Sequence, residues 1–98
     1  MDNEYELNRT LFVWNMIKCT DNRCRHGVEF TEAASVFDDP LMKITEAGRN
    51  GECRDKAIGF SSEGTLLSVI HVEHEKGESI RIISAWPATA AEEALYDQ

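Results

Sequence analysis

The segment Cys24-Arg25-His26-Gly27-Val28-Glu29-Phe30 ends one predicted helix and leads into another. Gly27 can adopt the left-handed conformation that ends a helix, and this places the titratable ring of His26 at a helix C-terminus. Asn15 is suited to cap the N-terminus of the same helix, so we expect the helix to run from about Met16 to His26.

Four side chains of this helix form a polar stripe. Lys18, Asn22 and Arg25 stand at i, i+4 and i+7 and therefore share one face, and His26 lies one position further round. The spacing alone leaves two interpretations open, because the stripe either faces solvent like any surface helix or faces a functional groove.

The remainder of the chain alternates between short apolar segments and polar turns. We expect strands at residues 11–14, 41–45, 55–60, 65–73 and 78–85, and a polar loop at 46–52. A second helix should be capped by Thr31 and should end before Asp38-Asp39-Pro40. A C-terminal helix should begin at the capping box Thr89-Ala90-Ala91-Glu92. The predicted fold class is α+β: a small antiparallel sheet of four to five strands with two N-terminal helices and one C-terminal helix. The helices should cover one face and leave the other partly open to solvent. Residues 1–98 form a single predicted domain, of which residues 1–10 are a disordered or extended N-terminal segment.

Arg81 is unusual because it lies inside an apolar strand, Arg81-Ile82-Ile83-Ser84-Ala85. A charged side chain in such a strand needs a groove, an anion or a carboxylate partner, so we expect Arg81 to face an open site. Strict alternation predicts two sets of side chains on opposite sides of the sheet: Ile80, Ile82 and Ser84, and Arg81, Ile83 and Ala85.

Composition excludes several classes of function. The 98-residue chain carries a formal net charge of −8, which argues against generic binding to nucleic acid. The N-terminus lacks the features of a secretory signal and no segment is long and apolar enough to cross a bilayer, so we expect a cytoplasmic protein with no membrane association.

The cysteine and histidine spacings do not favour a metal site. Cys19, Cys24 and Cys53 are odd in number and lack paired spacing, so we interpret them as reduced thiols, and we expect no metal or other cofactor. For His71 the default interpretation is a packed ring, and His74 is interpreted as a turn residue.

Several polar residues suit phosphodiester chemistry. Cleavage of RNA needs a base for the 2′-hydroxyl, an acid for the leaving oxygen and cations for the charge that develops on the phosphate. His26 and Glu52 could exchange the protons, and Lys18, Arg54 and Arg81 could supply the cations. The competing interpretation is that these cations form ordinary ion pairs with the chain's 18 carboxylates.

An ordered set of residues between Leu11 and Tyr96 carries a family resemblance. Its N-terminal part comprises Phe12, Trp14, Lys18, Asn22, Arg25-His26-Gly27-Val28, Phe30, Ala33-Ala34, Val36-Phe37 and Asp39-Pro40. Its C-terminal part comprises Glu52, Arg54, Ile58-Gly59, Arg81-Ile82-Ile83-Ser84-Ala85, Ala88-Thr89, Glu92 and Tyr96. Together they resemble the BrnT family of toxins from bacterial type II toxin–antitoxin systems.

The resemblance implies a RelE-like ribonuclease that cleaves RNA, inhibits translation and uses no metal. It also implies a BrnA-like antitoxin, a ribbon-helix-helix protein through which alone the toxin would contact DNA. The catalytic candidates are Lys18, His26, Glu52, Arg54 and Arg81. The candidate RNA contacts are Asn22, Arg25 and Trp86, of which Asn22 would position other groups.

The sequence also departs from the family pattern. Asn15 stands where the family tends to have an aspartate, and Asn50 stands where a histidine is common. Trp86-Pro87 and Glu93 stand at positions that are usually basic, and the C-terminal helix has no cation. Lost phosphate contacts lower RNA affinity. Trp86 could compensate by stacking on a base, or it fills an apolar gap or a partner interface.

Two alternatives to an active ribonuclease remain open. The chain could be a catalytically weak or inactive relative that acts as a protein-interaction module, since expected cations are missing. It could also be a small-ligand or metal-binding domain built around its cysteines.

Overall fold

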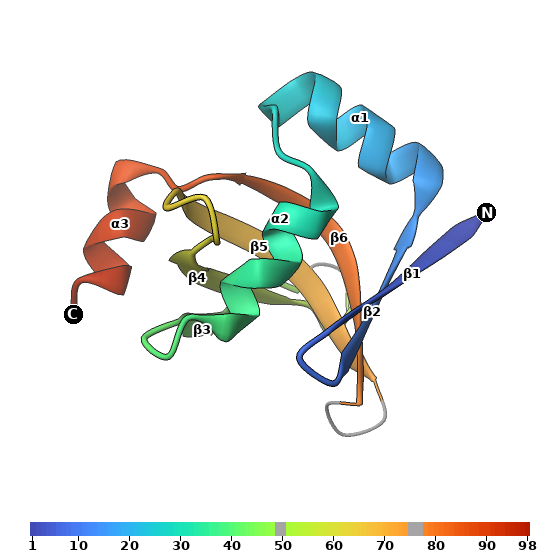
Figure 1. The fold of residues 1–98 in the computed structure, drawn as a ribbon. Helices are drawn as coiled ribbons and strands as arrows, with labels where there is room; N and C mark the ends of the chain where they lie inside the picture. Colours follow the sequence, from blue (N-terminus) through green and yellow to red (C-terminus); the bar gives the residue numbers. More distant parts are fainter. Residues whose placement is uncertain (49–50, 75–77) are drawn as a thin grey trace.

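The computed structural model describes residues 1–48, 51–74 and 78–98, which form a six-stranded sheet and three α-helices (Figure 1). The strands are β1 (Asp2–Leu7), β2 (Thr10–Asn15), β3 (Lys43–Glu46), β4 (Asp55–Phe60), β5 (Leu66–His74) and β6 (Ser79–Pro87). The helices are α1 (Met16–His26), α2 (Phe30–Ser35) and α3 (Ala90–Tyr96), with a 3-10 turn, η1 (Val36–Asp38), after α2. Positions 49 and 50 of the predicted polar loop, and with them Asn50, lie outside the described residues.

The sheet confirms the α+β class and corrects its details. Its strand order is β1-β2-β6-β5-β4-β3, and β2 pairs with β6 in parallel, whereas the other neighbours are antiparallel. The prediction of four to five antiparallel strands was therefore wrong. Its error lay in β1, which was not recognised as a strand, and in the parallel contact between segments distant in sequence.

Residues 2–7 form an edge strand because a tight turn folds them back on β2. Asn8 and Arg9 have φ angles of 49° and 68°, and the positive φ at both positions is typical of a two-residue type I′ hairpin. Tyr5 and Leu7 pack against the core, while Glu4 and Glu6, which alternate with them, are exposed. This alternation stabilises the strand although Asp2, Asn3, Glu4 and Glu6 are polar or charged.

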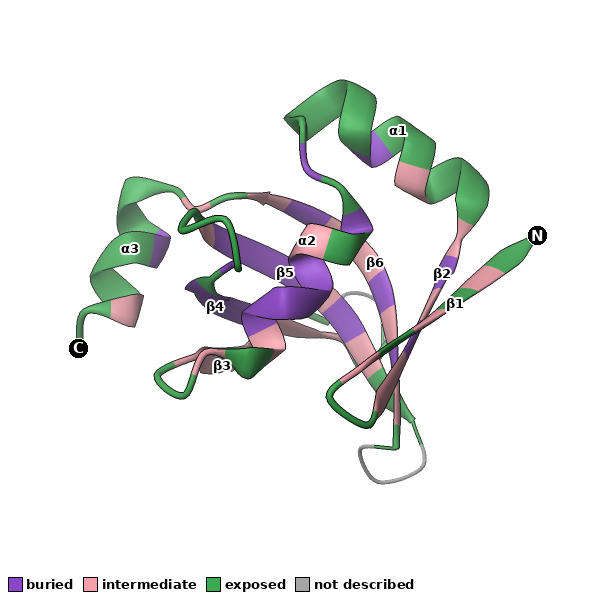
Figure 2. Ribbon diagram, in the orientation of Figure 1, coloured by how far each residue is buried: buried purple, intermediate pink, exposed green. Residues whose placement is uncertain are grey.

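The hydrophobic core lies between the sheet and α2, and we call this side of the sheet the inner face (Figure 2). Phe30 of α2 is fully buried, and its ring meets Trp14 of β2 edge-on at a centroid distance of 5.8 Å. The helix begins at Phe30 with Glu29 as its N-cap, so the predicted Thr31 cap was placed too late. His71 is also buried here, against Phe37, as its default interpretation expected.

A β-bulge in β6 changes which side chains face outward. Ile70 of β5 pairs with Ser84, but the next residue, His71, pairs with Ile82, which leaves Ile83 as the extra residue. Beyond the bulge Ala85 is fully buried on the inner face, and Ser84 shares the outer face with its partner Ile70. The predicted alternation therefore holds from Ile80 to Ile82 and was wrong for Ser84 and Ala85.

The three helices do not all cover one face, contrary to the prediction. Figure 1 shows α2 over the middle of the sheet, α1 along one side and α3 at the opposite end. Helix α3 contacts β4, whose Ile58 is fully buried but lies outside the cluster under α2. Tyr96 of α3 donates a hydrogen bond of 2.6 Å to Asp39, and this bond raises the pKa of Tyr96 to about 12. No helix in the described ranges is long and apolar enough to span a membrane.

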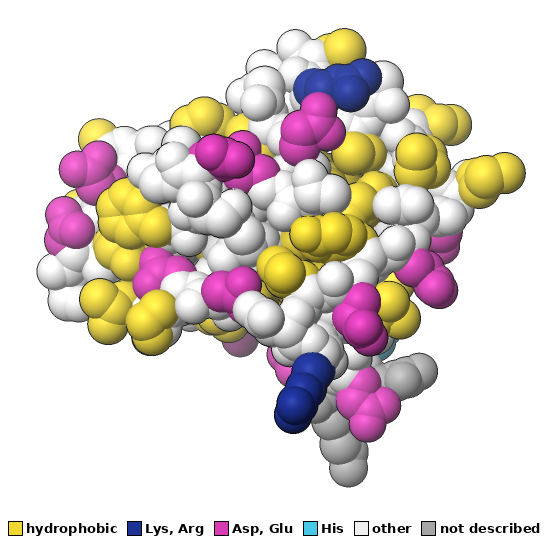
Figure 3. Space-filling model, viewed as in Figure 1, with side chains coloured by type: hydrophobic (Ala, Val, Ile, Leu, Met, Phe, Trp, Pro, Cys, Tyr) yellow, Lys and Arg dark blue, Asp and Glu magenta, His cyan; other side chains and the backbone are white. Residues whose placement is uncertain are grey.

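The face of the molecule that α2 covers carries few cations. In Figure 3 Lys and Arg side chains are sparse on this face, and Asp and Glu side chains are spread over it. The predicted cationic site therefore has to be sought at the α1 edge and on the outer face of the sheet.

Candidate functional site

The polar stripe of α1 lines a groove between this helix and β6. The groove has a volume of about 220 Å³ and is lined by Lys18, Asp21, Asn22, Arg25, His26, Ile83 and Ser84. All four predicted stripe residues are therefore brought together, and they face a strand rather than open solvent alone. The stripe therefore lines a groove, although Lys18, Arg25 and His26 are also exposed to solvent.

Asn22 fixes α1 to the part of β6 that lies beyond its pairing with β2. Its Nδ2 donates to the carbonyl oxygens of Val28 and Ala85, and its Oδ1 accepts from the N–H of Ala85 and the hydroxyl of Ser84, all within 2.9–3.1 Å. The carboxamide thereby bonds both backbone groups of Ala85, as a neighbouring strand would. Asn22 is only 4% exposed and uses its full hydrogen-bonding capacity inside the protein, so its contribution to the groove is positional.

The cap residues of α1 determine where His26 and Lys18 lie. Asn15 accepts hydrogen bonds from the N–H groups of Ile17 and Lys18, and Gly27 ends the helix with a φ angle of 71°. The groove residues Lys18, Arg25 and His26 are all exposed. Among the described residues, no carboxylate lies within 4.0 Å of the side-chain nitrogens of Lys18 or Arg25.

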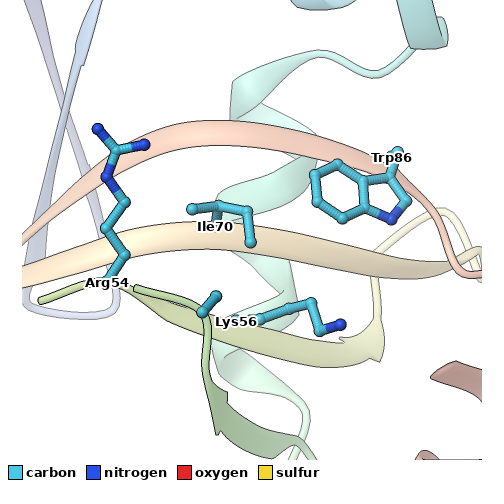
Figure 4. Close-up of a pocket in the computed structure, with 5 residues that line it drawn as sticks. Arg54, Lys56, Ile70 and Trp86 are labelled. Atoms are coloured by element: carbon cyan, nitrogen blue, oxygen red, sulfur yellow. The ribbon is translucent and has the colours of Figure 1, made fainter. Parts of the chain in front are cut away.

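A second hollow lies on the outer face of the sheet (Figure 4). Its volume is about 360 Å³, and it is lined by Ala47, Arg54, Lys56, Ile70 and Trp86. It adjoins the α1 groove, because Ile70 pairs with Ser84 of the groove and the ring centroids of Trp86 and His26 are 6.0 Å apart. The two hollows therefore lie next to each other, across β4, β5, β6 and α1.

The cations of the outer face are held by carboxylates of the protein itself. Arg54 lies 2.8 Å from Glu52, which places these two predicted site residues in contact with each other. Lys56 lies 2.9 Å from Glu92 of α3. In the outer-face hollow, Arg54 and Lys56 therefore form ion pairs with carboxylates of the chain, which was the competing interpretation of the cations.

Arg81 lies apart from both hollows. Its guanidinium binds both carboxylate oxygens of Asp2, at 2.7 and 3.4 Å. This hydrogen-bonded pair raises the pKa of Arg81 and lowers that of Asp2. The sequence predicted that the charge of Arg81 needs a carboxylate, an anion or a groove. In the structure a carboxylate fills this role, and it belongs to Asp2 of β1, the strand that the sequence analysis did not predict.

Glu92 is a site residue whose wider role went unrecognised. It was predicted as part of the capping box, which is present, and was included in the family resemblance. Its carboxylate also accepts hydrogen bonds from Trp86 Nε1 at 3.0 Å and from Lys56 Nζ at 2.9 Å. Burial alone would raise the pKa of Glu92, but the hydrogen bonds from Thr89, Lys56 and Trp86 lower it to about 2. The capping box and the family resemblance were the sequence signals for this residue, and neither of them pointed to a contact with Lys56 or Trp86.

The cysteines and histidines provide no metal centre among the described residues, where no group of three His, Cys, Asp or Glu side chains could hold a metal ion. Cys19 is partly buried against the core, whereas Cys24 and Cys53 are exposed free thiols. Burial lowers the pKa of His71, so its ring is neutral at pH 7.

Comparison with known proteins identifies one family. A model described as "Ribonuclease toxin, BrnT, of type II toxin-antitoxin system" matches residues 14–92. The crystal structure of the Brucella abortus ribonuclease toxin BrnT is similar, with a TM-score of 0.60 and 22% identity over 78% of this chain and 92% of that chain. At this identity the structural likeness shows a common fold. No curated protein sequence matches.

Proposed function

Because the chain belongs to the BrnT family of ribonuclease toxins of type II toxin–antitoxin systems, we propose that it cleaves RNA without a metal ion and thereby inhibits translation. The proposed catalytic residues are Lys18, His26, Glu52, Arg54 and Arg81, and the proposed RNA contacts are Arg25 and Trp86, with Asn22 positioning α1. We also propose a cytoplasmic location and a RelE-like mode of action.

The observation that carries this proposal is the α1 groove. Lys18, Arg25 and His26 line it together, and the two cations are exposed and have no carboxylate partner among the described residues. A phosphate in this groove would meet two cations beside the imidazole ring of His26. The outer-face hollow next to it provides room for the nucleotide that follows.

The chemistry follows from these groups. The 2′-hydroxyl of the RNA attacks the adjacent phosphorus, its proton passes to a base, and the bond to the 5′-oxygen breaks as an acid protonates that oxygen. His26 and Glu52 are the two proposed proton carriers. Lys18, Arg54 and Arg81 would stabilise the charge that develops on the phosphate oxygens. This requires Arg54 and Arg81 to exchange a carboxylate for the substrate, and it also requires Arg81, which lines neither hollow, to turn toward the phosphate.

The proposed partner is a BrnA-like antitoxin, a ribbon-helix-helix protein that neutralises the toxin and provides its contact with DNA. Membership of a type II family supports a protein antitoxin. The net charge of −8 supports the proposal that the antitoxin provides the contact with DNA, because an acidic chain gains little from counterion release on DNA.

A specific observation favours a second candidate function. Arg54, Lys56 and Arg81 are each paired with a carboxylate of the protein, and this lowers the positive potential available to RNA. A chain of this kind could retain the fold as a weak or inactive relative that binds a partner protein.

The deciding experiment measures cleavage of single-stranded RNA by the purified protein in the presence of EDTA. We expect the native chain to cleave, and His26→Ala and Lys18→Ala to lose most of the activity. Arg23→Ala is the matched control, because Arg23 belongs to the same helix but binds Glu29 outside the groove. Cleavage that persists in His26→Ala and Lys18→Ala would place the reaction elsewhere, and an inactive native chain would support the second candidate.

The antitoxin is tested by growth. We expect induced expression of the chain to arrest growth, and co-expression of a ribbon-helix-helix protein encoded beside it to restore growth. Arrest by the His26→Ala variant to the same degree would show that toxicity does not depend on this site.

A further inference from the structure

We propose that the outer-face hollow is a binding site for a single unpaired nucleobase together with its phosphate, and that Trp86 is the surface on which the base stacks. This inference rests on the proposed ribonuclease function and narrows its substrate to RNA with an unstacked base. The hollow of about 360 Å³ is large enough to admit one nucleotide.

The indole ring of Trp86 is held in a fixed orientation. Trp86 Nε1 donates a 3.0 Å hydrogen bond to Glu92, which is 6% exposed and is itself fixed by the hydrogen bond that it accepts from the backbone N–H of the N-cap residue Thr89. Trp86 also lies in β6, where it pairs with Ser68 of β5. An aromatic ring that is already ordered loses little conformational entropy when a ligand stacks on it.

The hollow combines an apolar surface with cations on one side. Figure 4 shows Trp86 and Ile70 over β6 and β5, with Lys56 on β4 and Arg54 just before it. The indole ring of Trp86 presents a flat face to a base, and the Ile70 side chain adds apolar surface beside it. Lys56 directs one hydrogen bond at Glu92, which leaves two ammonium protons. Arg54 Nη2 lies 2.8 Å from Glu52, and a guanidinium has five N–H donors, more than one carboxylate can occupy. These remaining donors suit a phosphate.

The arrangement favours an unpaired base over a paired one. A base in a duplex is stacked between its neighbours, so its face is not available to Trp86, whereas a base in a single strand can be turned out at low cost. Stacking is tolerant of base identity, because every base has a π-face. The site should therefore select single strands and discriminate weakly among sequences.

The charge balance predicts an unusual response to salt. Since Arg54 and Lys56 are each paired with a carboxylate, phosphate binding at this site releases few counterions. Stacking does not depend on counterion release. We expect the logarithm of the affinity to fall with the logarithm of salt concentration with a slope of only about −1 to −2, well below that of a basic RNA-binding protein.

The test is the binding of a short, fluorescein-labelled 2′-O-methyl oligonucleotide, which lacks the attacking hydroxyl and cannot be cleaved, measured by fluorescence anisotropy. Trp86→Leu should lower the affinity roughly tenfold, whereas Trp86→Phe should retain most of it, because phenylalanine still stacks. Phe60→Leu is the matched control, since Phe60 is an aromatic residue 46% exposed that does not line the hollow. A duplex of the same sequence should bind more weakly than the single strand.

The outcome is separable from that of the ribonuclease proposal. If Trp86→Leu binds as tightly as the native protein, or if the duplex binds as well as the single strand, the base site is wrong even where RNA cleavage is intact. If binding depends on Trp86 but RNA with a free 2′-hydroxyl is not cleaved, the base site stands and the ribonuclease function fails. Circular dichroism of each variant checks that the fold is retained.

Discussion

The carboxylate of Asp2 in β1 holds the guanidinium of Arg81 in β6, with Nη2 2.7 Å from Oδ2, although the two residues are 79 positions apart in sequence. The region that matches the family begins at residue 14, so Asp2 lies outside it. A strand that the family match does not include therefore neutralises the arginine that the family resemblance assigns to catalysis. The consequences of this contact can be measured.

Replacement of Asp2 by Asn should raise the affinity for RNA. The change removes the charge that competes with phosphate for Arg81, and we expect affinity to increase by roughly two- to tenfold at low salt. Anisotropy with a non-cleavable single strand measures it. Glu6→Gln is the control, because it removes the same charge from an exposed position of the same strand. Equal gains in both variants would indicate a general charge effect and contradict a specific competition at Arg81.

Replacement of Asn22 by Ala should destabilise the protein. The variant leaves the N–H and C=O of Ala85 without their side-chain partner at a buried edge, and we expect the free energy of unfolding to fall by about 2–4 kcal/mol. Urea denaturation measures the change. Thr20→Ala, which removes one exposed hydrogen bond to Met16 on the same helix, should cost less than about 1 kcal/mol. Similar midpoints for the two variants would contradict the role assigned to Asn22.

Glu92 should make the protein sensitive to acid. Its pKa in the folded state is about 2, below the ordinary value of 4.5, so its stabilisation is fully present above pH 4.5 and is lost as the pH falls toward 2. The contribution is on the order of 3 kcal/mol at most.

Thermal denaturation between pH 4.5 and pH 2 tests whether the contribution of Glu92 to stability is lost as the pH falls. Glu92→Gln should be less stable than the native protein at pH 7, and its stability should fall less between pH 4.5 and 2. Glu93→Gln, a change at the exposed neighbouring position, should follow the native curve. A parallel decline in Glu92→Gln would show that other carboxyl groups control the acid transition.

Gly27 should tolerate Asn better than Ala. Its φ of 71° is left-handed, and a Cβ at this position meets nothing within 4 Å, so the cost of substitution lies in the backbone. We expect Gly27→Ala to lose about 1 kcal/mol of unfolding free energy and Gly27→Asn to lose less, since asparagine adopts this conformation more readily. Chemical denaturation of the two variants compares them directly. If both variants lost the same unfolding free energy, the left-handed φ angle of Gly27 would not be the cause of the loss.

Residues close in sequence were predicted well because they interact within one turn of a helix or strand. The bounds of α1 followed from Asn15 and Gly27, and the capping box of α3 followed from Thr89 and Glu92. The placement of Lys18, Arg25 and His26 along one side of α1 also required only helical spacing, whereas the groove that they line needs β6 as its other wall. Each of these features depends on dihedral preferences and hydrogen bonds that the local sequence specifies.

The sequence by itself therefore determined the ends of α1, the capping box of α3, the polar stripe of α1 and the family. Only the tertiary structure decided that β2 runs parallel to β6, that Ile83 is the extra residue of a bulge, and that Asp2 and Glu92 hold Arg81 and Lys56. The physical reason is that a carboxylate in a chain with 18 of them carries no local mark of its partner. Which cation it meets depends on strand order and register, and these are set by how the whole chain buries its apolar side chains together.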